Sequence, residues 1–137
     1  MTDIYLESDL SPQDLGYFGE ILAAGMLALR GIPVRPGGAA DLLIYENVPI
    51  EIKTATERAI NDHVTGFQFC ISRQGRSELR APFAILICYQ DPPIRCPIFI
   101  IPDSEIGTRK TIAIPSPVDS YNGRWKKWRN QWELLGR

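Results

Sequence analysis

The chain has few of the residues from which zinc sites and disulfide frameworks are built. Its 137 residues include three cysteines and one histidine, and no two cysteines stand at a C-x-x-C spacing. Structural zinc sites use four cysteine or histidine ligands, so the composition argues against one. We expect Cys70, Cys88 and Cys96 to be reduced core thiols, because they lie in or beside apolar segments. We expect His63 to lie in a solvated loop.

The sequence also lacks long apolar runs, internal repeats and low-complexity segments. Its apolar stretches stop well short of the roughly 20 residues that cross a membrane, and its acidic N-terminus does not resemble a signal peptide. Hydrophobic residues make up 45% and charged residues 23% of the chain, as in an ordinary globular protein. We therefore expect a single domain over residues 1–137, in the cytoplasm and with no membrane contact.

The net charge of −1 is too small to hold nucleic acid by bulk attraction, but the charge is unevenly distributed. Residues 1–50 carry two basic and seven acidic side chains, whereas residues 109–137 carry seven basic and two acidic ones. A cationic C-terminal end is compatible with a phosphate-binding surface. A solvated charged face is the ordinary alternative.

One long helix is predicted near the N-terminus. Ser11 is a typical N-cap, Pro12 suits the first helical position, and Gly31 suits the position just beyond a helix that ends near Arg30. Three glycines inside the helix, Gly16, Gly19 and Gly25, indicate close approach to a sheet. The expected apolar face consists of Leu15, Phe18, Ile21, Leu22, Met26 and Leu29.

Strands are predicted next, beginning with a hairpin of residues 41–45 and 48–54 that turns at Glu46 and Asn47. Further strands are expected at 67–72, 84–89, 97–101 and 111–114, of which the second and third are continuous apolar runs typical of strands covered on both faces. A short basic helix is expected at 72–80. The order of elements predicts an α/β fold with a mixed β-sheet between the N-terminal helix and a C-terminal helix.

The C-terminal helix is predicted over residues 121–135. Trp125, Trp128 and Trp132 follow a helical spacing, with Leu135 continuing their stripe. We expect this stripe to dock the helix on the core or on a dimer partner, and stacking on nucleic-acid bases is the alternative.

The predicted hairpin contains the most informative residues of the chain. Glu51 and Lys53 share one face of a strand whose other face carries Ile50 and Ile52, and Asp41 opens the neighbouring strand. Two converging carboxylates with substrate phosphate suffice for Mg²⁺, and an adjacent ammonium can stabilise developing negative charge. The alternative is an exposed Glu51–Lys53 pair worth less than about 1 kcal/mol.

The residues around this hairpin resemble the PD-(D/E)xK nuclease superfamily. The similarity is strongest over residues 15–55, where Ala40 stands in place of the motif's proline, and it is closest to Holliday-junction-resolvase-like nucleases and intron homing endonucleases. It rests on the segments Gly16-Tyr-Phe-Gly-Glu20, Gly31-Ile-Pro-Val34, Asp41-Leu-Leu-Ile44 and Pro49-Ile-Glu51-Ile-Lys53-Thr54.

The resemblance implies a restriction-endonuclease-like core and a role for each matching residue. Asp41, Glu51 and the main-chain carbonyl of Ile52 would bind Mg²⁺ or Mn²⁺, and Lys53 would be the catalytic lysine. Glu20 would be the accessory acid on the helix, and Gln68 is similar to an extra polar position that some branches place near the site.

Together these expectations predict that the protein is a metal-dependent DNA endonuclease, which hydrolyses phosphodiester bonds with a metal-activated water. A homodimer is expected, because cutting two strands needs two sites. The alternatives are a non-catalytic nucleic-acid-binding or assembly module that retains the fold, and a structural domain with a surface Glu-x-Lys pair. The residues expected to contact DNA phosphates are Arg73, Arg76, Arg80, Lys126, Lys127 and Arg129.

Overall fold

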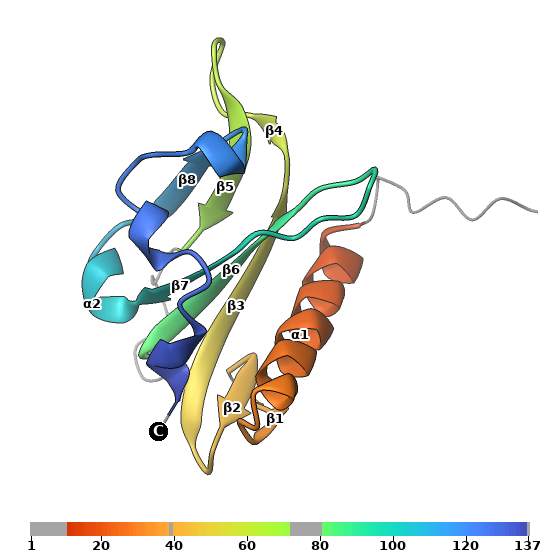
Figure 1. Ribbon diagram of the computed structural model, residues 1–137, viewed down its shortest axis with the longest axis vertical. Helices are drawn as coiled ribbons and strands as arrows, with labels where there is room; N and C mark the ends of the chain where they lie inside the picture. Colours follow the sequence, from red (N-terminus) through yellow and green to blue (C-terminus); the bar gives the residue numbers. More distant parts are fainter. Residues whose placement is uncertain (1–10, 39, 72–80, 137) are drawn as a thin grey trace, which may run out of the picture.

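The computed structural model describes residues 11–38, 40–71 and 81–136, and these form a mixed α/β fold (Figure 1). Two α-helices, eight strands and three 3-10 turns occur among the described residues. In chain order they are α1 (Pro12–Leu29), β1 (Val34–Pro36), β2 (Leu42–Ile44), β3 (Val48–Thr56), β4 (Arg58–Ala59), β5 (Thr65–Cys70), β6 (Phe83–Tyr89), β7 (Ile98–Pro102), α2 (Asp103–Ile106), β8 (Thr111–Pro115), η1 (Val118–Ser120), η2 (Lys126–Trp128) and η3 (Trp132–Leu135).

The main sheet has five strands in the order β1-β2-β3-β6-β7. β3 and β6 run parallel, while the other neighbours are antiparallel. The predicted hairpin is confirmed as β2 and β3, with Leu42 opposite Ile50. β6 and β7 are buried along almost their whole length, as their continuous apolar sequence predicts.

A second sheet, which the sequence did not predict as separate, has the order β4-β5-β8 and is antiparallel. Phe67 and Phe69 of β5 lie in one core cluster with Leu86 of β6 and Phe99 of β7. This cluster fills the space between the two sheets. A second cluster lies on the opposite face of the main sheet, under α1.

Helix α1 begins and ends where the sequence predicts. The Ser11 side-chain oxygen accepts a hydrogen bond from the Asp14 amide at 3.1 Å, which caps the first turn. Arg30 follows the last helical residue, and Gly31 adopts φ 73°, a left-handed conformation that favours glycine.

The buried face of α1 differs from the predicted one. Leu15, Gly19, Ala23 and Leu27 are buried against the sheet, whereas Ile21 and Leu29, predicted to face the core, are exposed. The prediction was wrong here because α1 carries no polar side chain after Glu20, so hydrophobic spacing does not distinguish the faces of this part of the helix.

Only one of the three predicted close approaches of a glycine to the sheet is confirmed. A Cβ at Gly19 would lie 1.8 Å from the Thr54 side-chain oxygen, so only glycine permits this packing of α1 on β3. A Cβ at Gly16 or Gly25 would meet nothing within 4 Å, so for these two positions the prediction was wrong.

The predicted C-terminal Trp-rich helix is replaced by the separate turns η2 and η3. Asn130 between them has φ 57°, which interrupts a right-handed helix, and its amide donates to the Ile98 carbonyl of β7 at 2.9 Å. Trp125 joins the cluster between the sheets and Trp132 joins the cluster under α1. One helical stripe could not reach both clusters, but the docking of these tryptophans on the core is confirmed.

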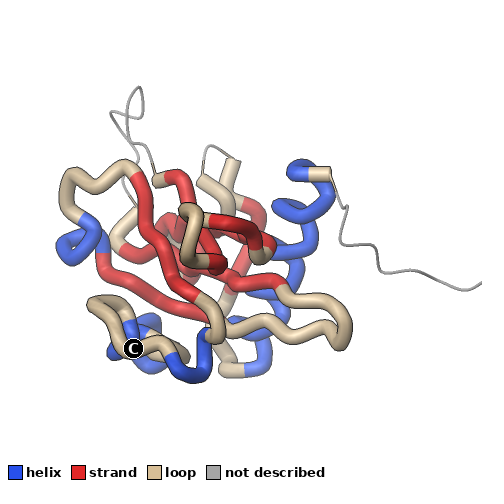
Figure 2. The backbone as a smooth tube through the Cα atoms, turned by 90° about the horizontal axis from the view of Figure 1, so that it is seen from above, coloured by secondary structure: helices blue, strands red, loops and turns tan. Residues whose placement is uncertain are grey.

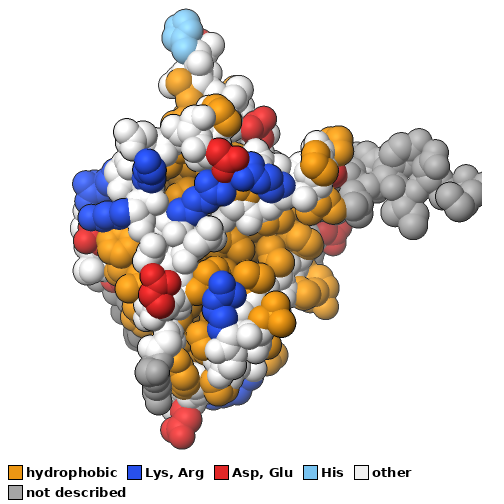
Figure 3. All heavy atoms as spheres, in the orientation of Figure 1, with side chains coloured by type: hydrophobic (Ala, Val, Ile, Leu, Met, Phe, Trp, Pro, Cys, Tyr) orange, Lys and Arg blue, Asp and Glu red, His pale blue; other side chains and the backbone are white. Residues whose placement is uncertain are grey.

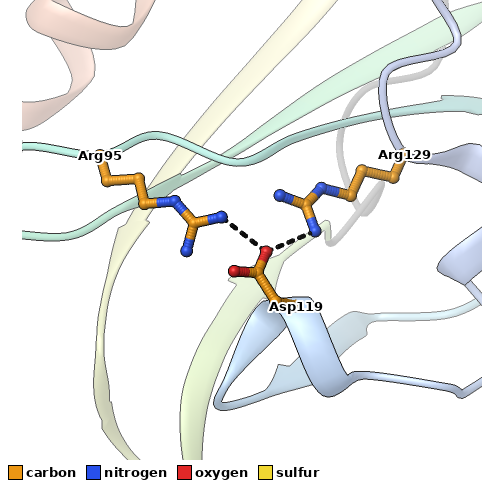
Figure 4. Close-up of polar contacts among 3 residues, drawn as sticks. All are labelled: Arg95, Asp119 and Arg129. Carbon is orange, nitrogen blue, oxygen red and sulfur yellow. Dashed lines mark hydrogen bonds and ion pairs between the residues drawn. The ribbon is translucent and has the colours of Figure 1, made fainter.

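An ion-pair cluster fixes this C-terminal segment to the β6–β7 connection (Figure 4). One Asp119 carboxylate oxygen accepts hydrogen bonds from Arg95 at 2.6 Å and from Arg129 at 2.9 Å. The hydrogen bond from Arg95, followed by that from Arg129, lowers the pKa of Asp119 to about 2.

The isolated expectations about cysteine and histidine are largely met. Cys88 is buried and Cys96 is half-buried, whereas Cys70 is exposed and is therefore not a core thiol. His63 is exposed in the turn between β4 and β5, as predicted. The expected basic helix at 72–80 lies outside the described residues. No helix in the described part of the chain is long and apolar enough to cross a membrane.

Candidate active site

Glu51 and Lys53 lie side by side on β3, on the face opposite α1. Ile50 and Ile52 point into the cluster under α1, so strand alternation turns Glu51 and Lys53 toward the second sheet. The Lys53 Nζ atom is 3.7 Å from Glu51 Oε1. The side chains are 11% exposed for Glu51 and 28% exposed for Lys53.

This burial decides against an ordinary surface ion pair. Among the residues that the structure describes, Glu51 is the only polar or charged one as buried as the core. A buried carboxylate loses its hydration, and that loss must be offset by nearby charges and hydrogen bonds. Lys53 supplies one such charge.

Asp41 approaches the same part of β3 from the neighbouring strand. Asp41 directly precedes Leu42, the first residue of β2, which is paired with Ile50 of β3. The Asp41 Oδ2 atom accepts a hydrogen bond of 2.7 Å from the amide of Ile52. Asp41 is therefore held at the peptide that lies between Glu51 and Lys53.

Glu20 reaches this region from the middle of α1. Burial raises the pKa of its carboxyl group, and the negative charge of Asp41 and a side-chain hydrogen bond with Asp41 raise it further. Glu20 and Asp41 are therefore close neighbours. The structure thus pairs Glu20 with Asp41 and Glu51 with Lys53, and the Asp41 carboxylate is bonded to the Ile52 amide between the two residues of the second pair.

The available donors suit a hard cation. Among the described residues, no group of three or more His, Cys, Asp or Glu side chains is arranged to hold a metal ion. A metal here would depend on carboxylates of Asp41 and Glu51, the Ile52 carbonyl and water. These are oxygen donors, as Mg²⁺ prefers, and Mg²⁺ commonly binds through one or two carboxylates.

The other predicted residues that the structure describes lie on β5 and in the C-terminal segment. Gln68 is on the exposed face of β5, turned away from the core cluster that contains Phe67 and Phe69. Lys126 and Lys127 are exposed, and Arg129 is engaged with Asp119. Arg73, Arg76 and Arg80 lie outside the described residues.

A cavity of about 330 Å³ at the end of β3 was not predicted. It is formed where the parallel strands β3 and β6 end, a common place for ligand sites in α/β sheets. Its walls come from two segments far apart in the sequence, so only the strand pairing could have located it. The lining residues are Thr56, Glu57, Tyr89, Gln90, Asp91 and Pro92.

Comparison with known proteins supports the fold. No family model and no curated protein matches the chain. Among solved structures, the bacterial homing endonuclease I-Ssp6803I is similar, with a TM-score of 0.68 over 91% of each chain and 16% sequence identity. At this identity the likeness shows a shared fold, and it agrees with the predicted α/β core.

Proposed function

We propose that the protein is a Mg²⁺- or Mn²⁺-dependent DNA endonuclease of the PD-(D/E)xK type. The observation that carries this proposal is the Asp41 carboxylate bound to the Ile52 amide, between Glu51 and Lys53. The fold shared with a homing endonuclease supports the same class of substrate.

Each of the four residues has a distinct proposed role. Asp41 and Glu51, with the Ile52 carbonyl, would hold the cation, which when bound lowers the pKa of water and polarises the phosphoryl oxygen. Lys53 would orient the attacking water or stabilise negative charge that develops on the phosphate. Glu20 would act through Asp41, by holding it or a water ligand in position.

Exposed basic side chains would position the DNA backbone without reading its sequence. Lys126 and Lys127 are exposed on η2, where the Lys126 ammonium donates to Asn122 Oδ1 at 3.2 Å and the Lys127 ammonium lies 5.1 Å from the centre of the Trp128 ring. Arg129 would have to share its guanidinium with Asp119. Arg73, Arg76 and Arg80 belong to the same proposal. Because each chain contributes one site, cleavage of two strands calls for a homodimer.

One observation favours a second candidate function. The described residues contain no ready-made group of three metal-binding side chains. This is compatible with a non-catalytic DNA-binding or assembly module that retains the nuclease fold.

A cleavage assay separates the two candidates. Supercoiled, linear and four-way-junction DNA would be incubated with the protein and Mg²⁺ or Mn²⁺. We expect cleavage by the wild type, its loss in Glu51→Ala, and a fall of about 100-fold or more in Lys53→Ala. Absence of cleavage on all substrates, combined with retained DNA binding, would establish the non-catalytic module instead.

Matched variants show whether a loss of activity is specific to the site. Glu133→Ala and Lys110→Ala remove an exposed acid and an exposed lysine from other parts of the surface. We expect both to cleave at the wild-type rate. Binding should also weaken steeply with salt, because each phosphate contact releases counterions.

A further inference from the structure

The cavity at the end of β3 lies where the main sheet divides. Thr56 and Tyr89 are the last paired residues of the parallel strands β3 and β6. Beyond them, the chain after β3 enters the second sheet as β4, while the chain after β6 returns toward β7 through a bridge between Gln90 and Arg95. Figures 1 and 2 show this β6–β7 connection projecting from the body of the molecule. The cavity is the space that the two diverging segments leave between them.

The size and the lining of the cavity favour a small polar organic ligand. Its volume of about 330 Å³ lies at the lower end of the range of about 300–1,000 Å³ that is typical of small-molecule sites. The lining includes two hydroxyl groups, a side-chain amide and two carboxylates, which belong to Thr56, Tyr89, Gln90, Glu57 and Asp91. Such a lining offers hydrogen bonds to a ligand and little apolar surface.

The charge of the lining is negative and uncompensated. No lysine, arginine or histidine is among the lining residues. Glu57 accepts a hydrogen bond from the Ser116 hydroxyl, and Asp91 accepts one from the Tyr89 hydroxyl at 3.5 Å. Within the described part of the chain, neither carboxylate forms an ion pair with a basic side chain. The cavity therefore repels phosphates and attracts cations.

Tyr89 supplies a buried polar group at this cavity. The residue is 4% exposed, and its ring packs edge-on against the Phe18 ring of α1, with 5.3 Å between the ring centres. The distance of 3.5 Å from its hydroxyl to Asp91 is at the long limit for a hydrogen bond between oxygens. An amine placed between the two would donate to both oxygens at shorter distances. Packing against Phe18 holds Tyr89 in place for such a contact.

We propose that this cavity binds a small alkyl diamine in its diammonium form. One ammonium group would bind Glu57 and the other Asp91, because the two carboxylates come from the two diverging segments and a charge-assisted hydrogen bond is stronger than a neutral one. The Tyr89 hydroxyl and the Gln90 side-chain oxygen would accept further hydrogen bonds. None of these residues belongs to the Glu20, Asp41, Glu51 and Lys53 group, so the proposal does not rest on the proposed function.

An NMR titration of the isotope-labelled full chain, without DNA or metal, tests the ligand class. We expect diaminobutane to cause saturable shifts of the backbone amides at residues 56–57 and 89–91. Butanediol, which has the same carbon chain without the charges, should cause none. Shifts that never saturate, or equal shifts with the diol, would overturn the proposal. Displacement of the diamine by an equal concentration of Mg²⁺ would also overturn it, by showing a site for inorganic cations.

Variants that remove one charge each test the two carboxylates. Glu57→Gln and Asp91→Asn keep the side-chain volume, and each should raise the dissociation constant of diaminobutane about tenfold or more. Asp62→Asn is the matched control, because Asp62 is an exposed acid in the turn between β4 and β5, which projects from the rest of the molecule (Figure 3). Its dissociation constant should equal that of the wild type. Equal weakening in the control, or wild-type binding by both cavity variants, would overturn the proposal.

Discussion

Gly19 lies where α1 makes its closest approach to β3, and replacing it with alanine tests how tightly the two are packed. The added Cβ would lie 1.8 Å from the Thr54 side-chain oxygen, 3.1 Å from Thr54 Cβ and 3.4 Å from Ile87 Cδ1. No pair of non-bonded atoms tolerates the first distance. Either Thr54 must rotate within a buried contact or the helix must move away from the sheet.

The expected loss of stability follows from two opposing effects. Alanine favours a helix over glycine by about 0.5–1 kcal/mol, while overpacking of a core costs about 1–3 kcal/mol. Because the clash at Gly19 involves an atom close to the backbone of a central strand, we expect the upper part of that range. The net loss should be about 2 kcal/mol, measured as the free energy of unfolding in urea.

Gly16 provides the matched control because it lies in the same helix with nothing within 4 Å of its Cβ position. Gly16→Ala should stabilise the protein by about 0.5–1 kcal/mol. Thr54→Ala should relieve part of the damage in the Gly19→Ala background, with a coupling energy of about 1 kcal/mol or more. If Gly19→Ala were as stable as Gly16→Ala, the close approach of α1 to β3 would be refuted.

Three further predictions concern other parts of the fold. The depressed pKa of Asp119 means that its carboxylate stabilises the native state fully above pH 3.8 and loses this effect as the pH falls through about 2. Asp119→Asn should therefore flatten the pH dependence of urea unfolding between pH 2 and 4, and an unchanged slope would contradict it. Burial raises the pKa of Cys88 to about 12, so a thiol reagent at neutral pH should modify exposed Cys70 and leave Cys88 intact until the protein unfolds. Trp132 is 3% exposed, so Trp132→Ala should cost about 3–5 kcal/mol in unfolding free energy, whereas a cost below about 1 kcal/mol would show that η3 is not docked.

Local signals in the sequence were sufficient for the first helix and the hairpin. Ser11, Pro12 and Gly31 act through hydrogen bonds and backbone conformations within a few residues, so their positions fix both ends of α1. The β2–β3 hairpin is equally local, and the Asp41 carboxylate just before β2 bonds to the Ile52 amide of β3. The positions of Asp41, Glu51 and Lys53 on this hairpin were therefore predictable, while their role in a site stays a prediction.

Contacts between distant segments were not predictable in the same way. The spacing of the three tryptophans fits a helix, but Trp125 and Trp132 are buried in different core clusters. Between them, the Asn130 amide donates a hydrogen bond to the Ile98 carbonyl of β7. Likewise, the residues of β5 and β8 alternate as strands should, but nothing local shows that they form a sheet of their own. Pairing of this kind depends on tertiary contacts that override local preference.

The faces of α1 illustrate a different limit. An apolar residue such as Leu29 is predicted to lie in the core from its spacing along the helix. In the folded chain it is 83% exposed. In the second half of the helix, no side carries a polar residue. The hydrophobic spacing therefore could not say which side of the helix faces the sheet.

Glu51 stands in a strand whose neighbours on the other face are isoleucines, at a position where leucine or isoleucine would complete the cluster between the sheets. A carboxylate there lowers stability relative to such a residue, and a buried ion pair with Lys53 commonly recovers no more than the desolvation cost. Asp41 brings a second carboxylate to the adjoining Ile52 peptide, where it accepts a hydrogen bond from the amide. The proposed divalent cation would neutralise the charges of both Asp41 and Glu51 at once, and for this reason the proposed function is centred on these two residues.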